Sequence, residues 1–369
     1  VQAIILRQPT VDATRADGSQ DALLIRIETD EGITGVGEVD SLPSIIKAIV
    51  DAPPSHSNAM GLRSILIGEN PLEIDRLWHK MYRGSIYYGR QSAAIHAMSG
   101  IDIALWDIKG KVLGLPIHTL LGGPHRQDVR AYASTLMPDT PQETATVVSG
   151  IVERGFTAIK LGWGPFGKDA DLDVALVRAA REAAGDQVDL MFDIGMGWSS
   201  ADHAIRQVRR FEPYNPYWVE EPFWPDETAA YRKLADTVET RIACGEEDTT
   251  HWGFARLMEE TRVDVVQPDV TRAGGISELV KIAQQADLRG VTMAPHSWST
   301  GIIKAASLHV IGTMPNASFF EYCVQETELN QLLTVERFPV VDGKVALPTK
   351  PGLGVEVDED VVKHYQVGA

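Results

Sequence analysis

The sequence predicts an α/β protein in which a (β/α) barrel follows a smaller α+β domain. Two patterns predict this fold. From residue 129 onward, short apolar segments alternate with segments of helical periodicity. Six acidic or imidazole side chains follow the apolar segments at intervals of 23 to 27 residues. One such interval is about the length of a strand, a helix and two short loops, which is the repeating unit of a parallel βα array.

Residues 1–125 have the pattern of an α+β domain. Residues 22–28 predict a strand, residues 30–32 (Asp-Glu-Gly) a turn, and residues 33–38 the next strand. Helical patterns follow near residues 44–50, 71–83 and 91–110. Residues 326–369 lose the alternation of the barrel and contain a sequence typical of a β-hairpin (VVDGKVALP). We expect this tail to pack back on the first domain.

Residues 126–325 carry the predicted barrel. Strands are expected near residues 129–134, 157–161, 188–192, 217–219, 241–243, 264–266, 291–293 and 317–321. Helices are expected between them, the first opening at Thr140 with a capping box and the others near 170–183, 200–211, 226–237, 250–260, 276–288 and 300–312. A flavodoxin-like or dinucleotide-binding sheet is disfavoured, because no GxGxxG motif opens a helix after a strand.

Composition limits the kinds of partner. The 369 residues include no apolar run of 18 and no signal-peptide pattern at the start, so a membrane partner is not expected. The net charge of −17, without runs of lysine or arginine, argues against nucleic-acid binding. Cys244 and Cys323 have neither disulfide nor metal-thiolate spacing and are expected to be buried thiols of a reduced, cytoplasmic protein.

The residues at the strand ends predict a catalytic site. They are Asp193, Glu220, Glu246, Asp269, His296 and Glu321. Closing the barrel brings the carboxyl ends of its strands to one mouth, where barrel enzymes place their active sites. A charged residue at each strand end has no use in packing, so the pattern indicates chemistry.

Asp193, Glu220 and Glu246 end three consecutive strands and form a candidate metal site. Three hard oxygen ligands on one face suit Mg²⁺, and zinc is less suitable because the set has no cysteine or paired histidines. A single acidic residue at a strand end is usually a helix cap or a surface group, but three in succession favour a metal. Lys160 at the end of the second strand is the expected neutralising cation.

Two of these ligands are each followed by a second glutamate. Glu221 comes directly after Glu220, and Glu247 directly after Glu246. Because side chains alternate along a strand, we expect only the first member of each pair to point inward.

His296 and Asp269 end adjacent strands and form a candidate catalytic dyad. A carboxylate bonded to an imidazole fixes its tautomer and raises its basicity. A base opposite a metal is suited to removing a proton next to a carboxylate, with the developing enediolate held by the metal. Glu321 is expected to donate a hydrogen bond to that enediolate if burial keeps it protonated.

Several segments together resemble the mandelate racemase subgroup of the enolase superfamily over essentially the whole chain. They are IETDEGITGVGE, SGIDIALWDIKGKVLGLPIHTLLGG, VEEP, GEE, QPDVTRAGGI, APHSW and PGLGVEV. The resemblance implies a TIM-like (β/α)₇β barrel with an α+β capping domain formed by the N-terminal region and the C-terminal tail. It also implies one Mg²⁺ per subunit at the three carboxylates, the His296–Asp269 dyad, contact of Glu321 with a substrate carboxylate, and a homo-oligomer, either dimer or octamer.

Two positions depart from the family pattern. The family often has Lys-x-Lys on the second strand, whereas this chain has Lys160 and then Gly162. Racemisation needs proton transfer on both faces of the substrate, so the missing second lysine favours one-face chemistry. The other departure is Gly195, where the family commonly has asparagine.

The predicted function is therefore a Mg²⁺-dependent sugar-acid dehydratase (a hydro-lyase) acting on a small anionic aldonate or aldarate and giving a 2-keto-3-deoxy acid. An epimerase or sugar-lactone cycloisomerase using the same enediolate is the alternative, and an idle sugar-acid binder is a third. Candidate substrate contacts are Arg15, Tyr87, Arg90, Trp163, His251 and Trp298.

Overall fold

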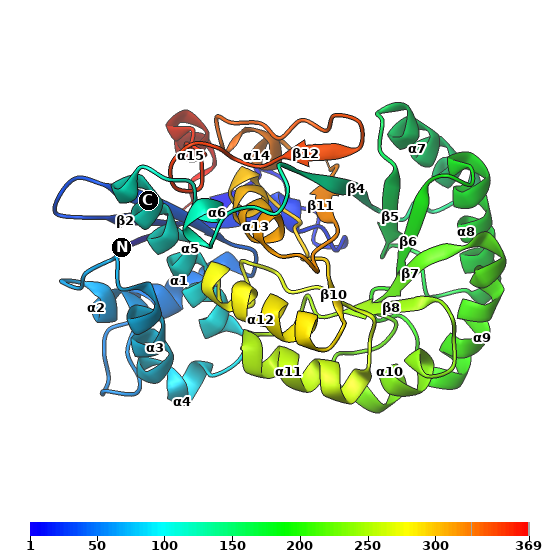
Figure 1. Cartoon of the computed structure of the whole chain (residues 1–369), viewed down its shortest axis with the longest axis horizontal. Coiled ribbons are helices and arrows are strands. Elements are labelled where there is room, and N and C mark those ends of the chain that lie inside the picture. The colour runs from blue at the N-terminus through cyan, green and yellow to red at the C-terminus, as the bar shows by residue number, and fades with distance from the viewer. Residues whose placement is uncertain (326, 368–369) are drawn as a thin grey trace.

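An eight-stranded parallel barrel forms the centre of the computed structural model, which describes residues 1–325 and 327–367 (Figure 1). Its strands are β4 (Asp128–Leu136), β5 (Ala158–Gly162), β6 (Asp189–Asp193), β7 (Pro216–Glu220), β8 (Arg241–Cys244), β9 (Val265–Val266), β10 (Thr292–Met293) and β11 (Phe320–Cys323). β11 pairs in parallel with β4, and a parallel bridge from Met293 to Ala317 joins β10 to the segment that enters β11. The sheet therefore closes, and the predicted (β/α)₇β order is confirmed.

A helix follows each of the first seven barrel strands and packs on the outside of the sheet (Figure 1). These helices are α7 (Pro141–Glu153), α8 (Ala170–Ala184), α9 (Ala201–Phe211), α10 (Thr228–Ala235), α11 (Thr250–Thr261), α12 (Ile276–Leu288) and α13 (Gly301–Thr313). α7 begins as predicted, because the Thr140 side chain accepts a hydrogen bond from the Glu143 amide and Pro141 fills the first position. Within the described residues, no helix combines the length and apolarity needed to cross a bilayer.

A layer of apolar side chains fills the barrel interior. Each strand, or the residue beside it, contributes one member: Tyr132, Ala158, Met191, Trp218, Ala243, Val265, Ala294 and Phe319. All are buried, and the rings of Trp218 and Phe319 meet edge to face with centroids 5.9 Å apart. This layer closes the floor of the barrel, so the next inward-facing residue on each strand faces the mouth.

The N-terminal region forms the capping domain that the resemblance implied. It consists of β1 (Gln2–Arg7), η1 (Gly18–Gln20), β2 (Asp21–Glu28), β3 (Thr34–Val39), α1 (Pro43–Asp51), α2 (Leu62–Leu66), α3 (Ile74–Gly84), α4 (Ile86–Gly89), α5 (Ala93–Leu113) and α6 (Ile117–Leu120). The three strands make an antiparallel sheet with β2 in the middle. The backbone of α5 lies directly on β3, because a side chain at Gly35 or Gly37 would overlap the α5 backbone.

Buried carboxylates of the cap hold the amino ends of two barrel helices. Asp102 on α5 accepts hydrogen bonds from the amide (3.0 Å) and hydroxyl (2.6 Å) of Ser277 at the start of α12. Glu38 on β3 accepts from the hydroxyl of Thr300 (2.7 Å) and the amide of Ile303 (3.0 Å) at the start of α13. The first turn of a helix has unsatisfied amides and a partial positive charge, so acidic side chains of the cap stabilise the barrel at these points.

The C-terminal tail returns only in part to the capping domain. It contains α14 (Glu328–Leu332), β12 (Lys344–Ala346) and α15 (Glu359–Tyr365), and Gln366 bridges to Leu6 on β1. β12 pairs antiparallel with residues 128–130 of β4, so this part of the tail packs on the barrel. β4 begins before its pairing with β5 and β11, so its first residues offer an open edge that β12 fills. Residues 326, 368 and 369 of the predicted tail lie outside the described residues.

Candidate active site

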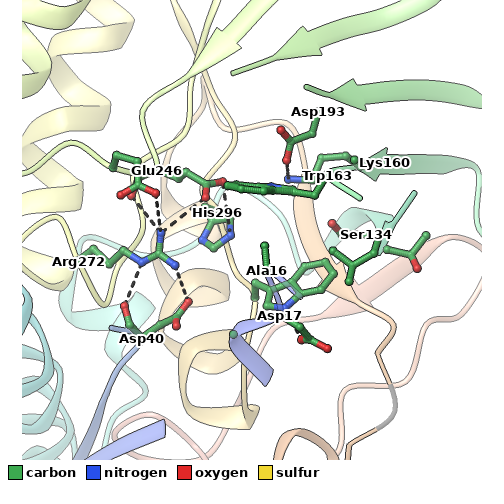
Figure 2. Close-up of a pocket in the computed structure, with 16 residues that line it drawn as sticks. Ala16, Asp17, Asp40, Ser134, Lys160, Trp163, Asp193, Glu246, Arg272 and His296 are labelled. Carbon is green, nitrogen blue, oxygen red and sulfur yellow. Dashed lines mark hydrogen bonds and ion pairs between the residues drawn. The ribbon is translucent and has the colours of Figure 1, made fainter. Parts of the chain in front are cut away.

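Strand alternation sets the position of most predicted site residues. Each lies two positions beyond a member of the interior layer and so on the same inward face: Lys160 after Ala158, Asp193 after Met191, Glu220 after Trp218, His296 after Ala294 and Glu321 after Phe319. All five are buried at the mouth of the barrel, and Figure 2 shows Lys160, Asp193 and His296 around the pocket there. The structure therefore brings together the residues that the sequence singled out.

Asp193, Glu220 and Glu246 converge on one point. Each offers a carboxylate oxygen within 4.8 Å of the others, and all three side chains are buried. Burial and the neighbouring Glu220 carboxylate raise the pKa of Asp193 well above its usual value. Three buried carboxylates that repel one another fit a divalent cation with oxygen ligands, such as Mg²⁺.

The expectation that only the first glutamate of each pair points inward is wrong for Glu221. This residue is 2 % exposed and comes within 4.8 Å of Glu246 and Glu247. Its φ of +41° turns the chain out of the extended conformation directly after β7, so strand alternation no longer applies. Its Oε2 atom has no hydrogen-bond partner among the described residues. Glu247, with a side chain 41 % exposed, lies at the rim and also lines the cavity.

Lys160 lies among the carboxylates of the site. Its ammonium hydrogen-bonds Glu220, pairs with Glu321 at 2.8 Å and lies 3.9 Å from Asp193. Burial alone would lower the pKa of Lys160, but Glu220 and Glu321 outweigh burial and raise it well above its usual value. The lysine is therefore a fixed positive charge at the floor of the site.

His296 and Asp269 are in direct contact. The Nδ1 atom of His296 lies 2.6 Å from Oδ2 of Asp269, whose other oxygen accepts from the amide and hydroxyl of Thr271, both at 2.6 Å. This leaves the Nε2 edge of the imidazole for the pocket, where it lies 3.6 Å from Glu246. Burial lowers the pKa of His296, but Glu246, Glu321 and the bond to Asp269 together raise it to about 10.

Glu321 differs from expectation in its charge. Burial raises the pKa of its carboxyl, but Lys160 and His296 outweigh burial and lower the pKa to about 2. Glu321 also accepts a hydrogen bond from the Ser297 amide at 2.8 Å. In this structure it is therefore an ionised acceptor, and not the protonated donor that burial alone predicted.

Asp40 and Arg272 are two further pocket residues that the sequence argument did not assign. The Arg272 guanidinium donates to a carboxylate oxygen of Asp40 (2.8 Å) and to its backbone carbonyl (3.0 Å), and it lies 3.7 Å from Glu246 (Figure 2). Asp40 belongs to the capping domain, two residues after Glu38, so this pair links cap and barrel at the site. The arginine of the QPDVTRAGGI motif was the available signal for this contact.

The predicted substrate contacts divide into two groups. A cavity of about 310 Å³ at the barrel mouth is lined by Trp163, Trp298 and the loop residues Ala16, Asp17 and Gly18, together with Asp40, Lys160, Asp193, Glu246, Glu247, Arg272 and His296. Arg15 lines the neighbouring cavity of about 1160 Å³. The loop of residues 14–18 thus reaches the pocket, and the Trp298 ring nitrogen lies 3.3 Å from Asp17.

Tyr87, Arg90 and His251 lie away from this cavity, which corrects their predicted role. Tyr87 is 73 % exposed and packs against His56, and Arg90 is exposed at the end of α4. Nδ1 of the His251 ring lies within hydrogen-bond distance of Glu278 at 2.7 Å, and the ring packs at a tilt against its neighbour Trp252. Tyr87 lies on the short helix α4 of the cap and Arg90 directly after it, and His251 lies in the first turn of the outer helix α11.

Two family models match the chain. The mandelate racemase / muconate lactonizing enzyme N-terminal domain matches residues 1–122, and the enolase C-terminal domain-like family matches residues 143–361. A D-galactonate dehydratase of Pectobacterium atrosepticum is 34% identical over 354 residues, covering 92% of this chain and 90% of its own length. A D-galactarolactone cycloisomerase of Agrobacterium fabrum is 33% identical over 357 residues, covering 94% of this chain and 91% of its own. The crystal structure of a 3,6-anhydro-D-galactonate cycloisomerase from Zobellia galactanivorans superposes with a TM-score of 0.90 at 30% identity, covering 100% and 98% of the two chains.

Proposed function

Because the chain belongs to the mandelate racemase and muconate lactonizing enzyme family of the enolase superfamily, we propose that it is a Mg²⁺-dependent dehydratase of a small sugar acid. The substrate is an aldonate or aldarate, and the product is a 2-keto-3-deoxy acid. The relatives named as dehydratases of D-galactonate support this class of substrate and reaction.

One observation carries the proposal. The free Nε2 edge of His296 faces the pocket 3.6 Å from Glu246, which is itself a member of the carboxylate triad. A base is thus placed directly beside the group that would hold a cation. Such an arrangement suits removal of a proton next to a carboxylate, whose weak acidity requires both a base and stabilisation of the resulting charge.

Asp193, Glu220 and Glu246 would hold one Mg²⁺ per subunit. When bound, the ion would stabilise negative charge that develops on the substrate carboxylate, and its charge would offset part of the repulsion within the triad. The same neutralisation would lower the pKa of His296 from its value beside bare carboxylates, so that the imidazole can accept a proton.

His296 and Lys160 carry the remaining steps. The Nε2 atom of His296 takes the α-hydrogen as a proton, and the electron pair moves into the carboxylate to form an enediolate. Lys160 supplies a fixed positive charge beside it. The enediolate then reforms the carboxylate, its electrons make a C2–C3 double bond, and the 3-hydroxyl leaves with the proton from His296 as water. The enol that remains converts to the 2-keto acid.

Substrate turnover tests the proposal. The purified protein is incubated with Mg²⁺ and D-galactonate, D-gluconate, L-rhamnonate or D-galactarate, and 2-keto acid is measured. At least one acid should give keto acid, His296→Asn should abolish the reaction, and His251→Asn should retain it, because that ring lies away from the cavity. Absence of keto acid and of α-proton exchange with every acid would refute the proposal and favour an idle binder.

A cycloisomerase or epimerase remains the second candidate, and the cycloisomerases among the relatives favour it. Such an enzyme would form the same enediolate. Exchange of the α-proton with D₂O and a change of configuration in the NMR spectrum, without keto acid, would identify an epimerase. Loss of the ring form of 3,6-anhydro-D-galactonate or of a sugar lactone, without dehydration of the open-chain acids, would identify a cycloisomerase.

A further inference from the structure

Gly162 leaves no room for a base on the side of the pocket opposite His296. It lies two positions after Lys160 on β5, so a side chain there would point into the barrel. A Cβ atom at this position would come within 2.7 Å of the Asp193 carbonyl oxygen and 2.9 Å of its Cγ. Any larger residue would therefore displace the first carboxylate of the triad.

Trp163 follows Gly162 directly after the end of β5. Its φ of +59° is uncommon for a residue with a side chain, and its amide donates to the Asp193 carbonyl at 3.1 Å. This turn aims the indole across the barrel mouth (Figure 2). The ring lines the catalytic cavity together with Lys160 and His296, and it also lines the adjacent cavity of about 1160 Å³, so it stands between the two.

Gly195 provides the surface on which this indole lies. A Cβ atom at Gly195 would come within 2.8 Å of Cδ2 and 3.0 Å of Cε3 of Trp163, and the φ of +57° also disfavours other residues. Gly162 and Gly195 are the two positions where the chain departs from the pattern of the family that it resembles. The Trp163 ring accounts for the glycine at 195, and the close approach of Asp193 accounts for the glycine at 162.

We propose that Trp163 is a substrate-binding wall that covers the face of the bound acid turned away from His296. This inference rests on the proposed function and adds to it the residue that confines proton transfer to one face. Two strands separate β5 from β10 on one side of the barrel and four on the other, and the triad comes from the ends of β6, β7 and β8 within the longer arc. An acid held at the triad would therefore lie between the indole and the imidazole. The π-face packs against C–H groups, has no group that titrates near neutral pH, and keeps water from the far face of the enediolate.

The test combines binding and stereochemistry in four variants. The probe is the acid of the panel above with the largest kcat/KM. Trp163→Ala removes the ring, Gly195→Ala displaces it, and Trp163→Phe keeps an aromatic wall. Trp224→Ala is the matched control, because that ring is 63 % exposed and outside the cavity lining. Circular dichroism and thermal unfolding verify that each variant is folded.

Binding is measured by calorimetry with Mg²⁺ in the His296→Asn background, where no turnover occurs. We expect the Kd to rise about tenfold for Trp163→Ala, which corresponds to about 1.4 kcal/mol, and less than about threefold for Trp163→Phe. With His296 present in D₂O, we expect recovered wild-type substrate to keep its C2 configuration. Trp163→Ala and Gly195→Ala should release a measurable amount of the C2 epimer.

The outcomes separate the two proposals. If the wild type makes keto acid but the Trp163→Ala and Gly195→Ala substrates keep their configuration, the shielding role is overturned and the dehydratase function stands. If the epimer appears equally with Trp224→Ala, the effect is not specific to this wall and the inference also fails. If the wild type neither exchanges nor dehydrates any acid of the panel, the proposed function fails and this inference fails with it.

Discussion

Replacing Lys160 with methionine is expected to destabilise the protein and to enlarge its response to magnesium. The Lys160 ammonium is buried, hydrogen-bonds Glu220, pairs with Glu321 at 2.8 Å and lies 3.9 Å from Asp193. Methionine preserves most of the volume but removes the charge. Glu220, Glu321 and Asp193 then lose the cation that they share, while their own negative charges remain buried.

The size of the effect follows from the burial of this ion pair. Removing one partner of a buried pair costs about 3–5 kcal/mol. Unfolding entropy is about 2.1 cal/mol/K per residue, or about 0.8 kcal/mol/K for this chain, so Tm should fall by about 4–6 °C in the presence of a chelator. Mg²⁺ should recover part of this loss, because its charge replaces that of the lysine. α-Proton exchange should fall by about 10²–10³-fold, because the positive charge beside the enediolate is gone.

Thermal unfolding with EDTA and with excess MgCl₂ measures the first effect, and NMR in D₂O measures the exchange. Lys304→Met is the matched control. This lysine is also buried, but its ammonium donates to the neutral side-chain oxygen Oδ1 of Asn330 at 3.1 Å. The Mg²⁺-induced rise in Tm should be larger in Lys160→Met than in wild type and unchanged in Lys304→Met. An equal rise in all three proteins, with exchange retained in Lys160→Met, would refute the argument.

Three further predictions concern the dyad and the cap. Asp269→Asn should lower turnover by about 10²–10⁴-fold with unchanged circular dichroism, because His296 loses the carboxylate that orients it. Glu38→Ala should lower Tm by about 3–8 °C in calorimetry, because two buried donors at the start of α13 lose their acceptor at about 1–3 kcal/mol each. Burial raises the pKa of Asp102 to about 7, above the value of about 3.9 in an unfolded chain. Between these values only the folded protein keeps this proton, so the stability of wild type relative to Asp102→Asn should fall by about 4 kcal/mol from about pH 4 to about pH 7 in urea titrations. A constant difference would contradict this assignment.

The barrel and the centre of its site were predictable because both follow from periodicity. Residues on one face of a strand recur every second position, so Asp193 and Glu220 could be placed from their strands alone. Glu221 could not, because the backbone leaves the strand conformation at that residue. A short apolar segment therefore predicts which way the following side chains point only where the backbone remains extended.

Contacts between distant segments were beyond the sequence argument. Asp40 and Arg272 are separated by 232 positions and meet only because the cap docks on the barrel. The strand β1 was likewise not predicted from the periodicity of its residues, because it is defined by hydrogen bonds to β2, which lies further along the chain. The pairing of β12 was also not predicted, because the open edge of β4 exists only once the barrel has closed.

The acidic side chains that hold the ends of α12 and α13 have a consequence for transplanting specificity between relatives. The loop of residues 14–18 is attached to the same sheet that carries Glu38, so a foreign cap would bring its own recognition loop but must also terminate two helices of the recipient. Chimeras that keep carboxylates at positions 38 and 102 should fold as single cooperative units. In chimeras that lose these carboxylates, the first turns of α12 and α13 should fray and the cap should dock poorly on the barrel, whichever recognition loop was transplanted.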